Sequence, residues 1–286
     1  MDWEKIKRFF IMLLLALNGG LFAANHFQGS QYHMTAEEEA AIFQLLSDNH
    51  IGIYTDLIYD TPPMRSIGAS TVSLDTSVLS SIFFSPEEQV KITLEFDKTV
   101  LASDTKSLIV EGNTVQYLNP NGDGPMENYN RETALEAADA FLEKINIYNQ
   151  PNLEAEKVEQ VGDNFVIEYN QRFKDYKIFS NAKTITVSPQ GVILATASYY
   201  QVENYVDESL PICSCDEALL TFLQKMKEEG VEENVYIEKI ELGYRLQEDG
   251  RVEDGASLRF IPCYRIITAT GGKTYFINAY TNEMMP

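Results

Sequence analysis

The segment Arg131–Ile145, RETALEAADAFLEKI, begins the part of the sequence with the clearest structural pattern. Its apolar residues recur every three or four positions, so we predict one amphipathic helix there. The turn SPQG, residues 188–191, precedes a last strand in the same stretch. The predicted strands are 153–160, 164–173, 183–187 and 192–201. The stretch therefore predicts one helix followed by four antiparallel strands.

The same order of elements recurs in the last quarter of the chain. A helix is predicted at 216–228, and strands follow at 236–247, 258–268, 274–278 and 284–285. The two copies match in pattern more than in residue identity, with a period of about 75 residues. We predict an α+β fold in which two repeats, residues 126–207 and 212–286, each pack one helix on an antiparallel sheet.

Residues 35–120 are predicted to form a further α+β region ahead of the repeats. Thr35 has the side chain and position of a helix cap, and the apolar residues after it have helical spacing. Strands are predicted at 51–54, 90–96 and 107–117, the last broken by a Gly112-Asn113 turn. The segment NPNGDGP, residues 119–125, carries the strongest turn signals and is predicted as a domain boundary.

The N-terminal segment predicts a transmembrane helix. Residues 9–27 contain no charged side chain and would span about 28 Å as a helix, close to the roughly 30 Å hydrocarbon core of a bilayer. Basic residues precede this span, so the positive-inside rule places the head, residues 1–8, in the cytoplasm. A polar stem, residues 28–34, would lead to extracellular domains. The residues expected to anchor and orient the helix are Trp3, Lys5, Lys7 and Arg8.

A cleaved signal peptide is the alternative for the same segment. Signal peptidases favour small residues at positions −3 and −1. A cut after Ala24 would place Phe22 at position −3, and a cut after Ala23 would place Leu21 there. Both are large, so the sequence favours an uncleaved anchor.

One face of the predicted membrane helix is lined by small residues. Ala16, Gly20 and Ala24 recur at four-residue spacing, which permits close backbone approach to another helix in lipid. Asn18 adds a polar group that is costly in hydrocarbon unless another helix satisfies it. Common Gly and Ala usage in membrane helices would also produce this pattern. The predicted packing face consists of Ala16, Asn18, Gly19, Gly20, Ala23 and Ala24.

The charge balance excludes one class of partner. Beyond residue 34 the chain carries 19 lysines and arginines against 41 aspartates and glutamates. A nucleic-acid backbone requires a basic surface, so we expect no nucleic-acid binding. Solubility is the simplest reason for the acidity.

No catalytic, cofactor or metal site is predicted. The last histidine is His50, so the repeats lack the commonest general base and metal ligand. Residues 119–124 resemble the start of a calcium loop, but the position of its bidentate glutamate is Asn130. The three cysteines fit buried small residues or one bridge from Cys213 or Cys215 to Cys263, which the sequence leaves open. We therefore expect a protein that is not an enzyme.

Tyrosine is abundant along the chain, with sixteen residues. Such side chains suit protein interfaces, because the ring supplies contact area while the hydroxyl stays hydrated. Ordinary strand propensity is the simpler explanation of each one, because aromatic residues suit pleated surfaces. Those singled out at the ends and on the strands of the repeats are Tyr199, Tyr200, Tyr205, Tyr264, Tyr275 and Tyr280.

The chain resembles the YycH/YycI regulatory proteins, specifically the YycI type. The resemblance is strongest in the N-terminal residues MDW, Lys5, Lys7, Phe10-Ile11 and Leu17-Asn18. It extends through Ile51–Ile53, Pro62–Met64, Tyr169–Asn181 and Tyr275–Glu283. The closing segment is also similar to PepSY-type domains, with Asn282 in place of their turn glycine.

The resemblance implies a single-pass protein of the Gram-positive cell membrane with its domains outside. Its family partners would be a YycH-type co-regulator and the transmembrane region of a sensor histidine kinase that governs cell-wall metabolism. The family supplies no catalytic residues. The alternative is an exported PepSY-type binding or inhibitory module that acts on a peptidase or ligand without a kinase.

Overall fold

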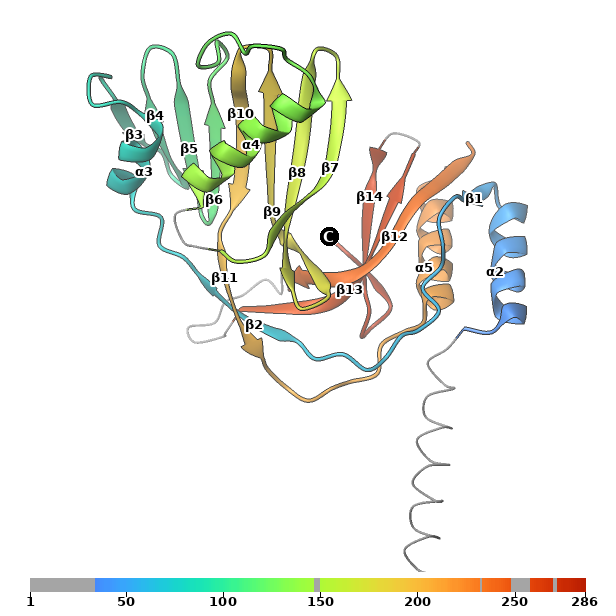
Figure 1. Cartoon of the computed structure of the whole chain (residues 1–286). Coiled ribbons are helices and arrows are strands. Elements are labelled where there is room, and N and C mark those ends of the chain that lie inside the picture. Colours follow the sequence, from blue (N-terminus) through green and yellow to red (C-terminus); the bar gives the residue numbers. More distant parts are fainter. Residues whose placement is uncertain (1–33, 147–149, 232, 248–257, 270–271) are drawn as a thin grey trace, which may run out of the picture. The chain divides into compact units, whose positions relative to one another are not determined.

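The computed structural model describes residues 34–146, 150–231, 233–247, 258–269 and 272–286 (Figure 1). These residues form a mixed α+β protein that is mostly sheet and has four helices. They divide into two compact units. Unit 1 holds the described residues up to Met64 with Ser209–Leu242 and Pro262–Pro286, and unit 2 holds Arg65–Glu208 and Gly243–Ile261.

Unit 2 is built on an antiparallel sheet with the strand order β7-β8-β9-β10-β6-β5-β4-β3. Alternate residues of its strands are buried, as expected for a sheet with one face on a core. The strands are β3 (Lys91–Leu94), β4 (Lys98–Ala102), β5 (Ser107–Glu111), β6 (Thr114–Leu118), β7 (Leu153–Val161), β8 (Asn164–Phe173), β9 (Tyr176–Ser188) and β10 (Gly191–Ser198).

Two helices supply the other side of this core. They are α3 (Thr76–Phe83) and α4 (Arg131–Ile145), and α4 lies across the sheet in Figure 1. Phe83 of α3 and Phe141 of α4 both pack against Tyr117 of β6, with ring centroids 5.1 and 5.2 Å away. The three rings join α3, α4 and the sheet in one hydrophobic cluster.

A second ladder in unit 2 consists of β2 (Ile67–Thr71), β11 (Tyr200–Tyr205) and the first residues of β13 (Leu258–Thr268). β2 pairs antiparallel with both of the others. Tyr199 separates β11 from β10, so the chain passes from the large sheet directly into this ladder.

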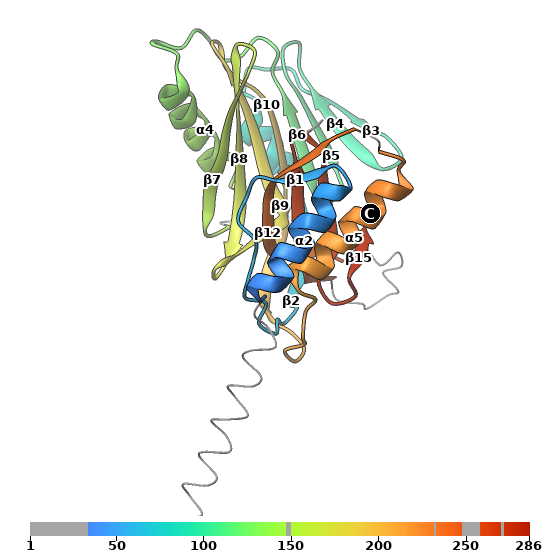
Figure 2. The same cartoon turned by 90° about the vertical axis from the view of Figure 1, so that its right-hand side faces the viewer.

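Unit 1 pairs two helices, α2 (Ala36–Asp48) and α5 (Cys215–Glu228), which lie side by side in Figure 2. Thr35 caps α2 in a capping box with Glu38, because the hydroxyl accepts from the Glu38 amide and the carboxylate accepts from the Thr35 amide. The strands of unit 1 are β1 (Ile51–Ile53), β12 (Val235–Leu246) up to Leu242, β13 from Pro262, β14 (Thr274–Asn278) and β15 (Glu283–Met285).

The order predicted for the repeats is present in both stretches. α4 is followed by β7 to β10, and α5 is followed by β12 to β15, with consecutive strands as neighbours. Four elements were not predicted as separate elements: β2 and α3 in the Ser/Thr-rich segment before Ser85, β4, and β11. The predicted strand at 90–96 contains β3, which forms a hairpin with β4.

The predicted boundary at 119–125 lies inside unit 2. This loop is hydrogen-bonded to the β9–β10 turn, with the Gly124 amide donating to Gln190 (3.1 Å) and the Met126 amide to Pro189 (2.9 Å). Gly122 has φ 64°, and a Cβ there would lie 1.9 Å from the Gln190 carbonyl oxygen. Gly122 therefore serves close packing within one unit. The predicted range 35–120 is divided between the two units at Met64.

The predicted transmembrane helix at 9–27, with its head and stem, lies outside the described residues. Within the described ranges, no helix has the length and apolar character needed to cross a bilayer.

We expect Phe222→Ala to lower the free energy of unfolding by about 3–5 kcal/mol, because the ring is fully buried in unit 1 and packs edge-on against Tyr275. Leu220→Ala on the same helix removes a side chain that is 42% exposed and should cost about 0.5 kcal/mol or less. Urea unfolding followed by circular dichroism measures both. Equal losses would contradict the placement of α5.

Candidate functional site

The site residues predicted from the sequence cannot be placed, because they lie outside the described residues. They are Trp3, Lys5, Lys7, Arg8, Ala16, Asn18, Gly19, Gly20, Ala23 and Ala24. The described residues contain a different candidate, a groove in unit 2.

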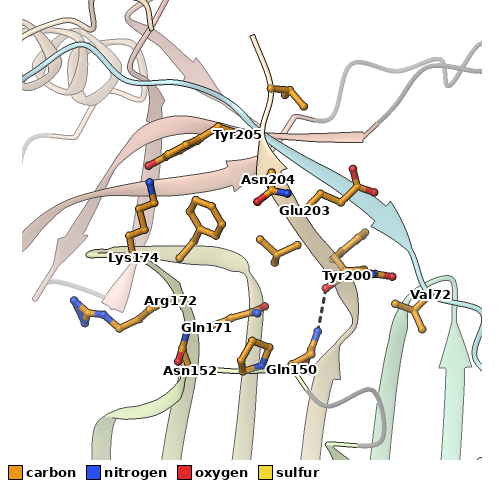
Figure 3. A pocket seen from close by; sticks show the side chains of 15 residues that line it. Val72, Gln150, Asn152, Gln171, Arg172, Lys174, Tyr200, Glu203, Asn204 and Tyr205 are labelled. Carbon is orange, nitrogen blue, oxygen red and sulfur yellow. Dashed lines mark hydrogen bonds between the residues drawn. The ribbon is translucent and has the colours of Figure 1, made fainter. Parts of the chain in front are cut away.

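The groove has a volume of about 1020 Å³ and opens between β11 and the turn that joins β8 to β9 (Figure 3). Gln171–Lys174 form one wall and Tyr200–Val206 form the opposite wall. Gln150, Pro151 and Asn152, which precede β7, close the lower end. The groove thus lies where the chain leaves the large sheet for the second ladder.

Buried amide side chains form the floor of the groove and the layer directly beneath it: Gln150 and Gln171 line the groove, and Asn181 bonds to them from below. Asn181 is fully buried on β9, and its amide donates to Gln171 Oε1 at 2.6 Å and to the Tyr200 carbonyl at 2.9 Å. Its Oδ1 accepts from the Tyr200 backbone N–H at 3.1 Å. Gln150 Nε2 donates to the same carbonyl at 3.1 Å, as drawn in Figure 3. The side chains thereby bond Tyr200 as a neighbouring strand would.

Lys183 lies beneath this floor and is fully buried. Its Nζ donates to Gln150 Oε1 and lies 3.5 Å from the Ser198 carbonyl. The Tyr199 ring centroid is 5.1 Å from the same nitrogen. No salt bridge joins Lys183 to a carboxylate in the part of the chain that the structure describes. Burial therefore lowers the pKa of Lys183 from 10.5 to about 7.

The rim of the groove combines cations with aromatic rings. Lys174 Nζ lies 4.3 Å from the centroid of the Tyr205 ring, and Figure 3 shows the two side chains facing each other. Phe173 meets Tyr205 edge-on at 5.1 Å, and the Arg65 guanidinium lies 5.4 Å from the same ring. These contacts hold Tyr205 between two cations at the mouth of the groove.

One backbone edge lines the groove. β11 pairs with β2 on one side, and among the described strands it has no other neighbour. Backbone groups of a strand point alternately to its two sides, and those of Tyr200 point to the floor amides. The N–H and C=O of Val202 therefore face the same side, into the groove. This edge can hydrogen-bond an added extended segment.

The groove offers amides, cations, rings and a strand edge, with Glu203 as the one carboxylate among its lining residues. The thiols lie elsewhere, because Cys213, Cys215 and Cys263 belong to unit 1. None of them is part of a disulfide bond, so neither candidate bridge is formed. Burial raises the pKa of Cys215 to about 11 and that of Cys213 to about 12. Among the described residues, no group of His, Cys, Asp and Glu side chains could hold a metal ion.

Part of this site had a signal in the sequence. Of the tyrosines singled out there, Tyr200 and Tyr205 line the groove, whereas Tyr199 and Tyr264 are fully buried. The Tyr199 hydroxyl donates to the Ile145 carbonyl at the end of α4, at 2.9 Å. The amides and Lys183 gave no signal, because polar residues in a strand look solvent-exposed in sequence.

The fold is similar to that of a solved structure. An uncharacterized protein from Eubacterium rectale ATCC 33656 aligns with a TM-score of 0.52 and 13% identity, over 82% of this chain and 89% of that one. The Bacillus megaterium YpeB C-terminal domain aligns with a TM-score of 0.39 and 16% identity, over 76% of this chain and 96% of that one. No curated protein matches the sequence.

The fold and groove thus define a mixed α+β protein with an open polar groove. A family model described as YycI protein matches residues 29–280, most of the chain. The chain belongs to the YycI family, as its sequence motifs predicted. This is a regulatory family of two-component signalling.

The buried lysine predicts a pH dependence of stability. Between pH 7 and 10.5 the unfolded chain binds more protons at Lys183 than the folded chain does, so stability rises with pH. The slope contributed by this one group is at most about 1.4 kcal/mol per pH unit. Lys183→Met should remove that contribution, as measured by urea unfolding at pH 7 to 9. The thiols, whose ordinary pKa is 9.0, contribute equally to the slopes of the two chains that are compared.

Lys174→Met is the matched control, because Lys174 is exposed on the neighbouring turn. It should keep the slope of the unmodified chain. A Lys183→Met chain with the same slope as the Lys174→Met chain would contradict the assignment.

Proposed function

We propose that the chain is a membrane-anchored extracytoplasmic regulator that binds a sensor histidine kinase together with a YycH-type partner. The family match over residues 29–280 is the observation that carries this proposal. The charge pattern and apolar run of the first 27 residues support an uncleaved helix with its N-terminus in the cytoplasm. The process regulated would be cell-wall homeostasis in a Gram-positive cell.

The regulation we propose is a bias between two states of the kinase. A membrane helix that packs better against one state than the other shifts the equilibrium by the difference in its binding free energy. A difference of about 1–3 kcal/mol changes the ratio of the states five- to more than hundredfold. The small residues around Gly20 would provide the contact, and the extracellular units would tune it.

Gly20→Ile in the full chain should reduce recovery of the kinase from solubilised membranes several-fold, because a branched side chain prevents close helix approach. Leu15→Ile is the matched control, since position 15 falls on the opposite side of a helix with 3.6 residues per turn and the change conserves volume. Quantitative mass spectrometry of the co-purified proteins measures both.

Unchanged recovery with Gly20→Ile would contradict the helix contact. Recovery of a peptidase in place of a kinase by the unmodified chain would contradict the proposal as a whole and favour the PepSY-type binding module.

A further inference from the structure

The last strand of the unit 2 sheet, β3, exposes apolar side chains at an open edge. β3 pairs with β4, and it ends the strand order among the described strands. Ile92 and Leu94 are 55% and 80% exposed, and Phe96 in the following turn is fully exposed. Ile92 is opposite Leu101, which is fully buried in the core cluster, so this apolar row extends the core face of the sheet.

The hydrogen-bonding edge of β3 is available on the same residues. The Glu95 amide donates to the Lys98 carbonyl at 2.9 Å and closes the β3–β4 hairpin. Residues 91, 93 and 95 therefore direct their backbone groups toward β4, and those of Ile92 and Leu94 point to the open edge. Such an edge pairs readily with another strand unless it is covered.

The sequence of β3 is complementary to itself in one register. We propose that β3 pairs antiparallel with β3 of a second copy of this chain, about a two-fold axis at Thr93. This register places Lys91 opposite Glu95, Ile92 opposite Leu94, and Thr93 opposite Thr93. Ile92 of each copy then forms a hydrogen-bonded pair with Leu94 of the other copy. This agrees with the backbone groups of both residues, which point to the open edge.

The charges and the apolar row favour this occupant over a strand of unrelated sequence. Lys91 and Glu95 are exposed, and the register joins each to its opposite charge on the other copy. The apolar row then runs through both copies on one face, and the exposed turn residue Phe96 comes next to Val90, which is half-buried against the core of the other copy. The pairing is independent of the kinase-binding function proposed above.

Disulfide trapping in the full chain tests the pairing and its register. Every variant carries Cys213→Ser, because Cys213 is half-buried whereas Cys215 and Cys263 are buried. Thr93→Cys should form a disulfide-linked dimer on mild oxidation in detergent, since opposed residues in a non-hydrogen-bonded pair have Cα atoms about 4.5 Å apart. Gln116→Cys, exposed on β6 between β5 and β10, is the matched control and should stay monomeric.

The register is tested by two further variants. Lys91→Cys and Glu95→Cys should each yield little disulfide-linked dimer alone. An equal mixture of the two should yield about half as much as Thr93→Cys, because about half of the randomly formed dimers contain one copy of each variant and so place the two thiols opposite each other. Non-reducing electrophoresis measures each fraction. The proposal is overturned if Thr93→Cys dimerises no more than Gln116→Cys, or if Lys91→Cys alone dimerises as well as the mixture. Neither result would affect the membrane-helix contact tested by Gly20→Ile.

Discussion

The passage of the chain from β10 to β11 depends on one set of hydrogen bonds, those that the Asn181 amide makes with the backbone of Tyr200. A strand that leaves a sheet loses its backbone partners, and an unpaired buried N–H or C=O costs about 1–3 kcal/mol. Asn181 supplies both a donor and an acceptor, and Gln150 adds a second donor to the same carbonyl. These side chains occupy the position of a neighbouring strand at Tyr200 alone. The backbone edge of β11 therefore becomes open at Val202, within the wall of the groove.

The same amides explain how a lysine without a salt bridge is accommodated beneath the groove. A buried ammonium has three hydrogens to donate. Lys183 donates to Gln150 Oε1 and lies farther from the Ser198 carbonyl, with the Tyr199 ring beside it. The neutral amine needs fewer acceptors, so burial favours proton loss near neutral pH. The charge of Lys183, directly beneath the floor of the groove, therefore changes near pH 7.

The elements with a clear period or cap could be predicted from sequence, and those that depend on long-range pairing could not. Arg131–Ile145 is α4 to the residue, because a helix is specified by spacing within its own segment and here also by a cap at Asn130. β2 was not predicted, since its partners β11 and β13 lie more than a hundred residues away in sequence. The loop at 119–125 has the composition of a linker, yet its turns pack against Gln190, which local sequence cannot show. The groove was missed for the same reason: its amides become a site only where Asn181, Gln150 and Tyr200 meet.

Electrostatics limit how such a chain can associate with another copy. A net charge of −21 repels a second copy at long range, but at physiological ionic strength the screening length is about 8 Å. Charges spread over the distant surface are then largely screened, whereas Lys91 and Glu95 would lie in direct contact across the β3 edge. Association of this acidic chain is thus governed by local complementarity of backbone, side-chain volume and charge. β3 and the residue after it, Glu95, supply this complementarity of backbone, volume and charge within five residues. Their charged side chains lie on one face of the strand and their apolar side chains on the other.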